Sequence, residues 1–364
     1  MSVAFDPSFW EGRRVLITGH TGFKGSWLTF WLSRMNAQTK GIALEPDTTP
    51  NMFDAVGIGA LCQHVVGDIN DEAPLRRELE AFQPEVVLHL AAQSLVRRSY
   101  DDPALTFRTN VSGTVNVLNA CRNCESVRSI VIVTTDKCYE NNNENRAFVE
   151  TDRLGGHDPY SNSKACAELV TASFRDSFFN PAEHESHHVG VASARAGNVI
   201  GGGDWCEDRL FPDAMRAFQA GRLPEIRMAN AVRPWQHVLE PLYGYLLLAQ
   251  ACFRDGPQYA RAWNFGPEKN QFLKVSDLLA KLSSRWPDGP GWTERGDASG
   301  KKEAETLFLD SSLAQERLGW RPGLSIDTIL DMTLEWYKSF YDNAGKEKLS
   351  RLTGAQIDRF MEFV

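Results

Sequence analysis

A tyrosine and a lysine at helical spacing are the residues with the clearest chemistry in this chain of 364 residues. Tyr160 and Lys164 lie in the segment PYSNSK. A spacing of four places both side chains on one face of a helix. An ammonium beside a phenol stabilises the phenolate, which lowers the pKa of the tyrosine from its usual value of about 10. The pair predicts a proton-transfer site in which Tyr160 acts as a base.

A short polar turn upstream supplies further proton-transfer groups. Thr135, Asp136 and Lys137 follow an apolar segment at 130–134. An open α/β sheet carries its reactive groups at the carboxyl ends of its strands, so this turn is a candidate part of the same site. The hydroxyl of Thr135 can share a substrate proton with Tyr160. The alternative is an ordinary polar turn that ends a strand.

A glycine turn near the start of the chain predicts a dinucleotide site. Gly19, Gly22 and Gly25 form a GxxGxxG spacing between an apolar segment and a helical one. Glycines there permit a tight turn and a close approach of backbone N–H groups to a pyrophosphate at the helix N-terminus. A turn without a ligand is the alternative. The predicted dinucleotide contacts are Gly19, Thr21, Gly22, Phe23, Lys24, Gly25, Asp68, Ile69, Ala91, Tyr160 and Lys164.

Two acids and a stretch without cations favour NAD over NADP. Asp68 ends the third apolar segment, where it can accept a hydrogen bond from an adenine amino group or simply cap a helix. Glu45 lies about twenty residues past the glycine turn, where an acid meets a ribose hydroxyl. No Lys or Arg occurs between Lys40 and Arg76, where a 2′-phosphate would need one. Lys24 in the glycine turn is the alternative cation that could reach a 2′-phosphate.

The residues named above must be positioned by strands and helices, and segments typical of each alternate through the first half of the chain. Apolar segments predict buried parallel strands, and segments with helical periodicity lie between them. This alternation predicts an α/β fold with a doubly wound parallel sheet of Rossmann type. The predicted strands are 15–18, 41–44, 65–66, 86–90, 130–134 and 189–194, and the predicted helices are 27–35, 72–82, 104–121 and 160–178.

The second half has a different pattern, with longer helical stretches separated by loops that contain Pro and Gly. Helices are predicted over 239–253, 276–285 and 326–341, and a surface loop over 286–302. The length suggests two folding units of about 150 residues each. We expect residues 1–200 to form an NAD-binding domain. Residues 201–364 are expected to form a smaller substrate-binding region, which can be interleaved with the first.

Composition narrows the class of protein. Hydrophobic residues make up 42% of the chain and charged residues 24%, and a net charge of −8 argues against a nucleic-acid-binding surface. The apolar stretch 243–253 is shorter than the ~20 residues that span a bilayer. No signal peptide is evident at 1–10, and seven cysteines suit reduced thiols. We expect a cytoplasmic protein without a membrane or nucleic-acid partner, and no metal site, because Cys121 and Cys124 have no second pair.

With these motifs, and with Asn110 in TNVSGT, the chain resembles the extended short-chain dehydrogenase/reductase family. Thr135 and Asp136 at the strand end are similar to the nucleotide-sugar 4,6-dehydratases of that family. Longer strings resemble the branch that acts on CDP-sugars: GHTGFKGSW (19–27), TDKCY (135–139), AGNVIGGGDW (196–205) and RPWQHV (233–238). Lys137 is a departure, because most of the related dehydratases carry Glu at this position.

The resemblance implies an NAD-dependent lyase that converts CDP-glucose to a 4-keto-6-deoxy sugar nucleotide. The implied catalytic residues are Thr135, Asp136, Lys137, Tyr160 and Lys164. Tyr160 and Thr135 would act on the 4-hydroxyl, Asp136 would be the acid for the departing 6-hydroxyl and Lys137 the base at C5. The expected substrate contacts are Gln93, Ser94, Asn198, Arg209 and Arg233, with Arg233 the first candidate because a guanidinium fork matches phosphate oxygens.

Other functions stay open at this point. A different nucleotide-sugar 4,6-dehydratase or a 4-epimerase of the same family would share the motifs. A dinucleotide sensor without turnover would not need the proton-transfer groups. A homodimer or higher homo-oligomer is expected, with helices 104–121 and 160–178 as candidates for pairing. Trp205, Phe211 and Trp235 could stack on a base or pack in the core.

Overall fold

The central element of the computed structural model is a seven-stranded sheet with the strand order β11-β7-β5-β4-β1-β2-β3. All of its strand pairs are parallel. The structure describes residues 3–144, 146–268, 271–287, 289–295 and 306–364. The strands of this sheet are β1 (Arg14–Thr18), β2 (Gln38–Ala43), β3 (Gln63–Val66), β4 (Val86–His89), β5 (Ser129–Val133), β7 (Gly190–Ala196) and β11 (Ala262–Phe265).

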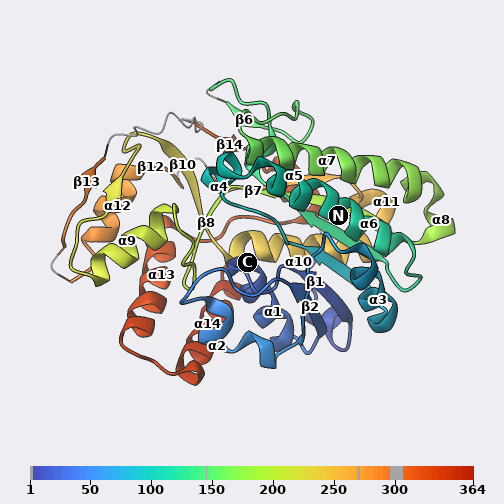
Figure 1. Ribbon diagram of the computed structural model, residues 1–364, viewed down its shortest axis with the longest axis horizontal. Helices are drawn as coiled ribbons and strands as arrows, with labels where there is room; N and C mark the ends of the chain where they lie inside the picture. Colours follow the sequence, from blue (N-terminus) through green and yellow to red (C-terminus); the bar gives the residue numbers. More distant parts are fainter. Residues whose placement is uncertain (1–2, 145, 269–270, 288, 296–305) are drawn as a thin grey trace.

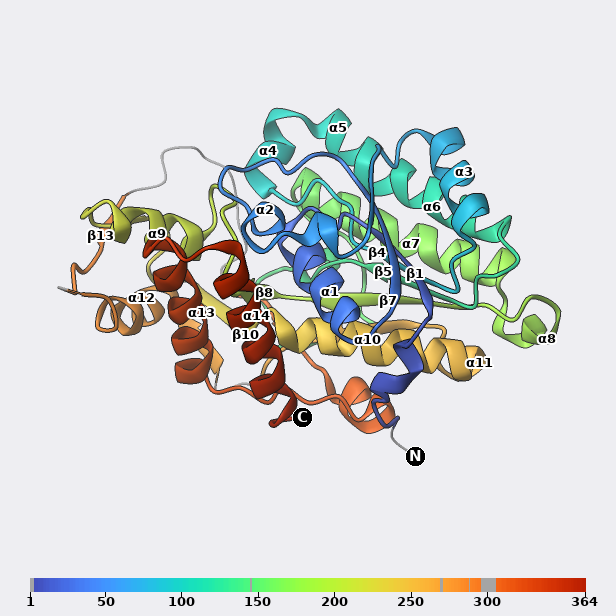
Figure 2. The same cartoon turned by 90° about the horizontal axis from the view of Figure 1, so that it is seen from below.

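Helices cover both faces of this sheet. Figure 2 shows α3, α6 and α7 on one side of the strands and α10 on the other. The helices of the sheet region are α1 (Phe23–Arg34), α2 (Met52–Val56), α3 (Glu72–Phe82), α4 (Val96–Asp101), α5 (Pro103–Phe107), α6 (Gly113–Arg122), α7 (Pro159–Phe178), α8 (His184–His187), α10 (Leu239–Arg254) and α11 (Gly256–Tyr259). This arrangement confirms the predicted doubly wound fold.

The sheet is buried on both faces because alternate residues of each strand enter two different cores. In β5, Val131 and Val133 belong to the core under α1 and α10, whereas Ile130 and Ile132 belong to the core under α3 and α6. Side chains alternate between the faces of a strand, so a strand with two covered faces must be apolar throughout. This is why the strands read as unbroken apolar segments.

A smaller region lies beside the sheet in Figure 1. Its short strands are β8 (Asn198–Ile200), β10 (Val232–His237) and β12 (Phe272–Lys274) in one sheet, with β9 (Glu225–Ile226) pairing with β13 (Thr293–Glu294) and β6 (Ala147–Phe148) with β14 (Phe308–Leu309). Its helices are α9 (Leu210–Gln219), α12 (Val275–Ser283), α13 (Ile326–Tyr341) and α14 (Lys346–Met361).

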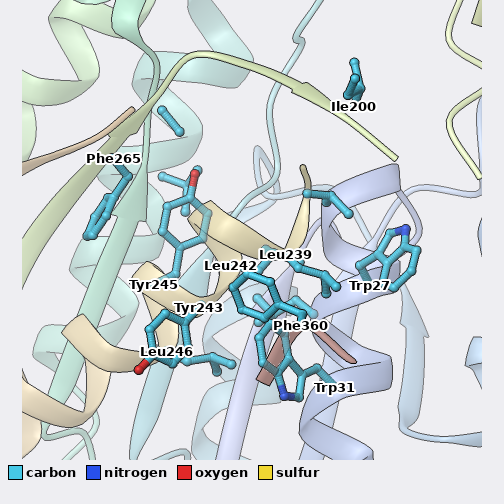
Figure 3. Packing of buried hydrophobic residues seen from close by; sticks show 14 of the residues in the cluster. Trp27, Trp31, Ile200, Leu239, Leu242, Tyr243, Tyr245, Leu246, Phe265 and Phe360 are labelled. Atoms are coloured by element: carbon cyan, nitrogen blue, oxygen red, sulfur yellow. The ribbon is translucent and has the colours of Figure 1, made fainter. Parts of the chain in front are cut away.

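The last helix packs against the first. Figure 3 shows Trp31 of α1, Tyr243 of α10 and Phe360 of α14 together in the core. The ring centroids of Trp31 and Phe360 are 5.8 Å apart, and those of Tyr243 and Phe360 are 5.9 Å apart. The end of the chain therefore closes over the sheet face that α1 and α10 cover.

The six predicted strands are all present, whereas other elements differ from the sequence-based prediction or, like α9 and β10, were not part of it. The predicted helix 104–121 is divided into α5, a π-helical turn at Arg108–Ser112 and α6. The strand β11 and the helix α14 were not predicted. The predicted surface loop 286–302 falls partly outside the described residues, and its described part contains the short exposed strand β13.

Within the part of the chain that the structure describes, no helix is both long and apolar enough to cross a membrane. All seven cysteines are free thiols.

Candidate active site

A cavity of about 620 Å³ lies at the carboxyl ends of the parallel strands, and a volume of this size suits a small-molecule site. It collects residues from both halves of the chain. All of the predicted site residues line it except Asp136: Gly19, Thr21, Gly22, Phe23, Lys24, Gly25, Asp68, Ile69, Ala91, Gln93, Ser94, Thr135, Lys137, Tyr160, Lys164, Asn198, Arg209 and Arg233.

The glycine turn has the geometry that an anion site requires. Gly19 has φ +78°, and a Cβ there would lie 2.7 Å from the backbone nitrogen of Ala91. A Cβ on Gly25 would lie 2.1 Å from the carbonyl oxygen of Gly19. Gly22 is the N-cap of α1, and no side chain caps this helix. The first turn of this twelve-residue helix lines the cavity, and among the described residues no side chain caps its N–H groups, as a phosphate site would need.

Two acids, Asp68 and Glu45, line the end of the cavity beside β2 and β3. Asp68 follows β3, and its Oδ1 accepts hydrogen bonds from the backbone and side-chain nitrogens of Asn70, each at 2.9 Å. Glu45 follows β2 and also lines the cavity. Thr21 donates a hydrogen bond to the carbonyl of Leu44 at 2.9 Å, which holds the glycine turn beside β2.

Tyr160, the predicted base, lies at the start of α7 because the local sequence begins a helix there. Asp158 caps the helix by accepting a hydrogen bond from the backbone nitrogen of Ser161 at 2.9 Å, and Pro159 occupies the first turn. Tyr160 is 8% exposed. Burial raises its pKa to about 12, while its hydrogen bond with Thr135 acts in the opposite direction. The lowered pKa that the spacing with Lys164 predicts is therefore wrong for this structure, because desolvation of the buried phenol outweighs the hydrogen bond of Thr135 and the charge of Arg209.

Lys164 lies beneath the cavity rather than at its mouth. Its ammonium donates a hydrogen bond to the carbonyl of Val133 at 3.1 Å, and the residue is 7% exposed. Burial lowers its pKa to about 8, although the charge of Glu168 raises it. Val133 is the last residue of β5, so this bond ties the catalytic helix to the strand that carries the polar turn.

The polar turn forms a short 3-10 helix, η4 (Asp136–Cys138), capped by Thr135. Lys137 lines the cavity, whereas Asp136 is 1% exposed and lies deeper. The hydroxyl of Thr135 donates to Oδ1 of Asp136 at 2.9 Å. Oδ2 has no hydrogen-bond partner among the described residues, and a Cβ on Gly197 would lie 2.9 Å from it. Glycine at this position gives the carboxylate its space.

One wall of the cavity is lined by cations from the second half of the chain. Arg209 forms an ion pair with Asp204 at 3.0 Å and donates a hydrogen bond to the hydroxyl of Ser94 at 3.0 Å. Its charged end is therefore fixed across the cavity between two segments. Arg233 in β10 and Asn198 in β8 line the same wall.

The side chain of Gln93, a predicted substrate contact, forms three hydrogen bonds within the protein. Its amide nitrogen donates to Leu95 and Thr106, and its amide oxygen accepts from the backbone of Leu95. Asn110 bonds both backbone polar groups of Gln93 at 2.9 Å, and it donates to the hydroxyl of Ser163 at 2.8 Å. Asn110 thus joins the loop after β4 to the catalytic helix.

The contact between Lys24 and Tyr245 was not predicted from the sequence. The ammonium of Lys24 lies 3.5 Å from the hydroxyl of Tyr245, which is fully buried on α10. Burial lowers the pKa of Lys24 to about 7, and the nearby charge of Arg209 lowers it further. Lys24 therefore points toward the catalytic end of the cavity and not toward the segment where a 2′-phosphate would lie. Nothing in the apolar pattern of α10 singled out Tyr245.

Of the three aromatic residues considered for base stacking, Phe211 and Trp235 line the cavity and Trp205 does not. Trp205 packs in the core, with ring centroids 4.7 Å from Phe340 and 5.5 Å from Trp336. Among the described residues, no group of three or more His, Cys, Asp or Glu side chains is arranged to hold a metal ion.

Comparison with known sequences identifies the chemistry of the relatives. A protein family described as GDP-mannose 4,6 dehydratase matches residues 16–259. The chain is 46% identical over 335 residues to a CDP-glucose 4,6-dehydratase of Salmonella typhimurium, a match that covers 92% of this chain and 93% of that protein. It is 30% identical over 337 residues to a dTDP-glucose 4,6-dehydratase of Streptomyces griseus, covering 89% and 93% of the two chains.

Solved structures share the fold. The UDP-glucose 4-epimerase of Thermotoga maritima, in a structure with UDP-glucose, superposes with a TM-score of 0.76 at 21% identity, over 90% of this chain and 99% of that chain. The dTDP-glucose 4,6-dehydratase of Streptomyces venezuelae, in a structure with NAD, gives a TM-score of 0.73 at 24% identity, over 90% and 97%. These similarities confirm the Rossmann-type fold class.

Proposed function

The chain belongs to the GDP-mannose 4,6-dehydratase family, and on that premise we propose that it is an NAD-dependent lyase that converts CDP-glucose to CDP-4-keto-6-deoxy-D-glucose. One observation carries the proposal: the turn of Thr135, Asp136 and Lys137 meets Tyr160 and Lys164 at one cavity, beside an uncapped helix N-terminus. The similarity to the Salmonella typhimurium enzyme supports CDP-glucose as the sugar nucleotide.

The glycine turn and the strand ends fit NAD. The N–H groups at the start of α1 would hold the pyrophosphate, and Asp68 and Glu45 would contact the adenosine. Phe23, Ile69 and Ala91 would complete the walls around it. When bound, NAD supplies a hydride acceptor for sugar C4 and returns the same hydride to C6. We assign this role to the sheet region within residues 1–200.

The first proton transfer belongs to Tyr160 and Thr135. Thr135 is close enough to Tyr160 to lower the pKa of the phenol, so a 4-hydroxyl group that reached both hydroxyls would have an acceptor for its proton. Because burial holds the pKa of Tyr160 at about 12, the phenolate needs further positive charge to form near neutral pH. Lys164 on the same helix face supplies one cation, and the oxidised nicotinamide ring would supply a second.

The elimination belongs to Asp136 and Lys137. A 4-keto group acidifies the proton on C5, so a base there and an acid at the 6-hydroxyl suffice to release water. Lys137 lines the cavity and would take the C5 proton. Asp136 has one carboxyl oxygen without a protein partner among the described residues, and as the carboxylic acid it would give its proton to the departing 6-hydroxyl, which would leave as water.

The nucleotide diphosphate would bind the wall built from residues 201–364 and the two short segments beside them. Arg233 and Arg209 supply guanidinium groups that match phosphate oxygens, and Asn198 and Ser94 add neutral hydrogen bonds. Gln93 would support this wall indirectly, since its side chain already bonds Leu95 and Thr106 and its backbone bonds Asn110.

Product analysis with four sugar nucleotides tests the function. The enzyme is incubated with CDP-, dTDP-, GDP- and UDP-glucose, and we expect a 4-keto-6-deoxy product from CDP-glucose with catalytic amounts of NAD and no accumulation of free NADH. Deuterium placed at C4 should appear at C6 of the product. Stoichiometric release of NADH would instead indicate a simple dehydrogenase, and a product inverted only at C4 would indicate an epimerase.

We also propose a homodimer formed by α5, α6 and α7. The outer face of α7 exposes two large apolar side chains, with Leu169 57% and Phe178 42% exposed. Pairing of these helices between two copies would remove the apolar surface from water. Light scattering of the wild type should give the mass of a dimer, and Leu169→Glu should shift the mass toward the monomer. A monomeric wild type would contradict the proposal.

A further inference from the structure

A buried ion pair lies directly beneath the catalytic turn. Glu168 and Arg195 are each 3% exposed, and their charged atoms are 2.8 Å apart. Glu168 also accepts hydrogen bonds from the hydroxyls of Thr134 and of Ser193, the latter at 2.6 Å. Arg195 donates to the hydroxyl of Tyr139 at 2.7 Å. The pair thus holds side chains from β7, α7 and both ends of the segment that contains the turn.

Two of these partners, Thr134 and Tyr139, lie on either side of the polar turn in the sequence. Thr134 directly precedes Thr135, the residue that caps η4, and Tyr139 directly follows the last residue of η4. The turn that carries the acid and the base is therefore anchored at both ends to one ion pair. Glu168 is itself one helical turn beyond Lys164 on α7, so the same carboxylate relates the turn to the catalytic helix.

Tyr139 also contacts a strand from the second half of the chain. Its hydroxyl donates a hydrogen bond to Oδ1 of Asn264 in β11 at 2.8 Å, and its ring lies 4.9 Å from the guanidinium carbon of Arg195. Arg195 also donates to the carbonyl of Glu150 at 3.0 Å. Tyr139 is 1% exposed, so its position is determined by packing as well as by these bonds.

Stability alone is a weak reason to place two charges here. Taking an ion pair out of water costs about as much as the attraction returns, and apolar residues of similar volume often replace such pairs without loss. Burial would raise the pKa of Glu168, but the charge and hydrogen bond of Arg195 and the two hydroxyls hold it below its usual value. The carboxylate is therefore charged, and directional hydrogen bonds to its neighbours are what the pair provides.

We propose that Glu168 and Arg195 are positioning residues that act through two hydrogen bonds, one for each half of the reaction. We call the bond from Thr134 to Glu168 the Thr134 arm and the bond from Arg195 to Tyr139 the Tyr139 arm. The Thr134 arm sets Thr135 against Tyr160 for oxidation at C4. The Tyr139 arm sets Asp136 and Lys137 for elimination across C5 and C6. This inference rests on the proposed dehydratase function, which supplies the two steps.

Single substitutions in the arms test the proposal without leaving a buried charge unpaired. Thr134→Val removes the first arm and Tyr139→Phe the second, while both keep the ion pair. Thr171→Val, which removes another buried hydroxyl of α7, and Tyr259→Phe on α11 are the matched controls. Rapid mixing with CDP-glucose measures the rate at which bound NAD is reduced and then reoxidised, thermal unfolding measures stability, and mass spectrometry measures the product.

The two arms should affect different steps. Thr134→Val is expected to slow the reduction phase by about 10- to 100-fold, since a misplacement of about 1 Å costs that much. Tyr139→Phe is expected to leave the reduction phase within about threefold of wild type and to slow reoxidation by about 10-fold or more, so that reduced cofactor accumulates. The controls should match the wild type in both phases.

Two results would overturn the inference. Equal slowing of both phases in both variants, in proportion to a lower melting temperature, would assign the pair a purely structural role. Rates in both variants equal to those of the controls would show that the arms position nothing. Absence of a 4-keto-6-deoxy product from the wild type is a separate outcome, because it contradicts the proposed function before any variant is compared.

Discussion

The floor and the wall of the cavity are built in different ways. The floor consists of the ends of β5 and α7 and of the turn between them. Apart from the half-buried Lys137, its predicted reactive residues are nearly inaccessible, with Asp136 1% and Lys164 7% exposed. The wall comes from residues 198–233 and from short segments near Ser94, and its side chains are more open, with 33% of the Arg209 side chain exposed. The floor is covered by protein, whereas the wall faces solvent.

The difference follows from what each part has to do. Proton transfer requires reacting atoms to be held within tenths of an ångström, which favours rigid elements and buried hydrogen bonds. Recognition of a diphosphate requires cations that can approach it from solvent and close over it. We therefore expect changes in the floor to lower the rate constant of a step, and changes in the wall to lower affinity.

The largest effect is expected from Tyr160→Phe, which removes the base from the floor. The rate of C4 oxidation should fall by about 10²- to 10⁴-fold, because general-base catalysis contributes on that order. Binding of NAD and of the nucleotide, measured by calorimetry, should change little, since the ring remains. Rapid reduction of NAD by CDP-glucose in this variant would refute the assignment.

Lys137→Met tests the second reactive group of the floor. Oxidation should proceed, and elimination should slow by about 10²-fold, because the base at C5 is lost while Tyr160 and Thr135 remain. Reduced cofactor should then persist on the enzyme after mixing with CDP-glucose. A near-normal turnover, or weaker substrate binding without persistent reduced cofactor, would assign Lys137 to binding or structure.

Arg233→Gln tests the wall. The KM for the nucleotide sugar should rise by about 10-fold or more with kcat little changed, because a charge-assisted hydrogen bond to phosphate is lost in every bound state. Arg222→Gln, at an exposed position outside the cavity, is the matched control. A fall in kcat at constant KM would move Arg233 from recognition to catalysis and weaken the comparison.

The smallest effect concerns a buried carboxyl group that supports the wall. Glu240 at the start of α10 accepts hydrogen bonds from the backbone nitrogens of His237, Gly323 and Leu324. Burial raises its pKa from 4.5 to about 7. Because the folded protein binds this proton more tightly than the unfolded chain, the stability it contributes is complete below pH 4.5 and is lost as the pH rises through about 7.

Urea unfolding at several pH values tests this expectation. Between about pH 5 and pH 8 the free energy of unfolding should decrease in the wild type by on the order of 1 to 3 kcal/mol more than in Glu240→Gln. The amide cannot titrate, so its contribution should be independent of pH. Parallel pH profiles for the two proteins would show that Glu240 keeps an ordinary pKa.

Much of the fold and of the site was predictable because the signals are local. The predicted helices 72–82 and 326–341 coincide with α3 and α13, since apolar residues at helical spacing define one buried face. The glycine turn, the turn after β5 and the Tyr160 pair were also evident from residue type and spacing. Each of these features depends on a few neighbouring residues.

The tertiary structure alone decided what lies against these elements. β11 joins β7 in the main sheet although it follows that strand by more than sixty residues, and no local pattern marks its partner. In the same way, Lys24 meets Tyr245, and Glu168 meets Arg195, from elements far apart in the chain. Burial, the raised pKa of Tyr160 and the anchoring of the catalytic turn all depend on how distant segments pack around a group, and a sequence specifies such packing only through the whole fold.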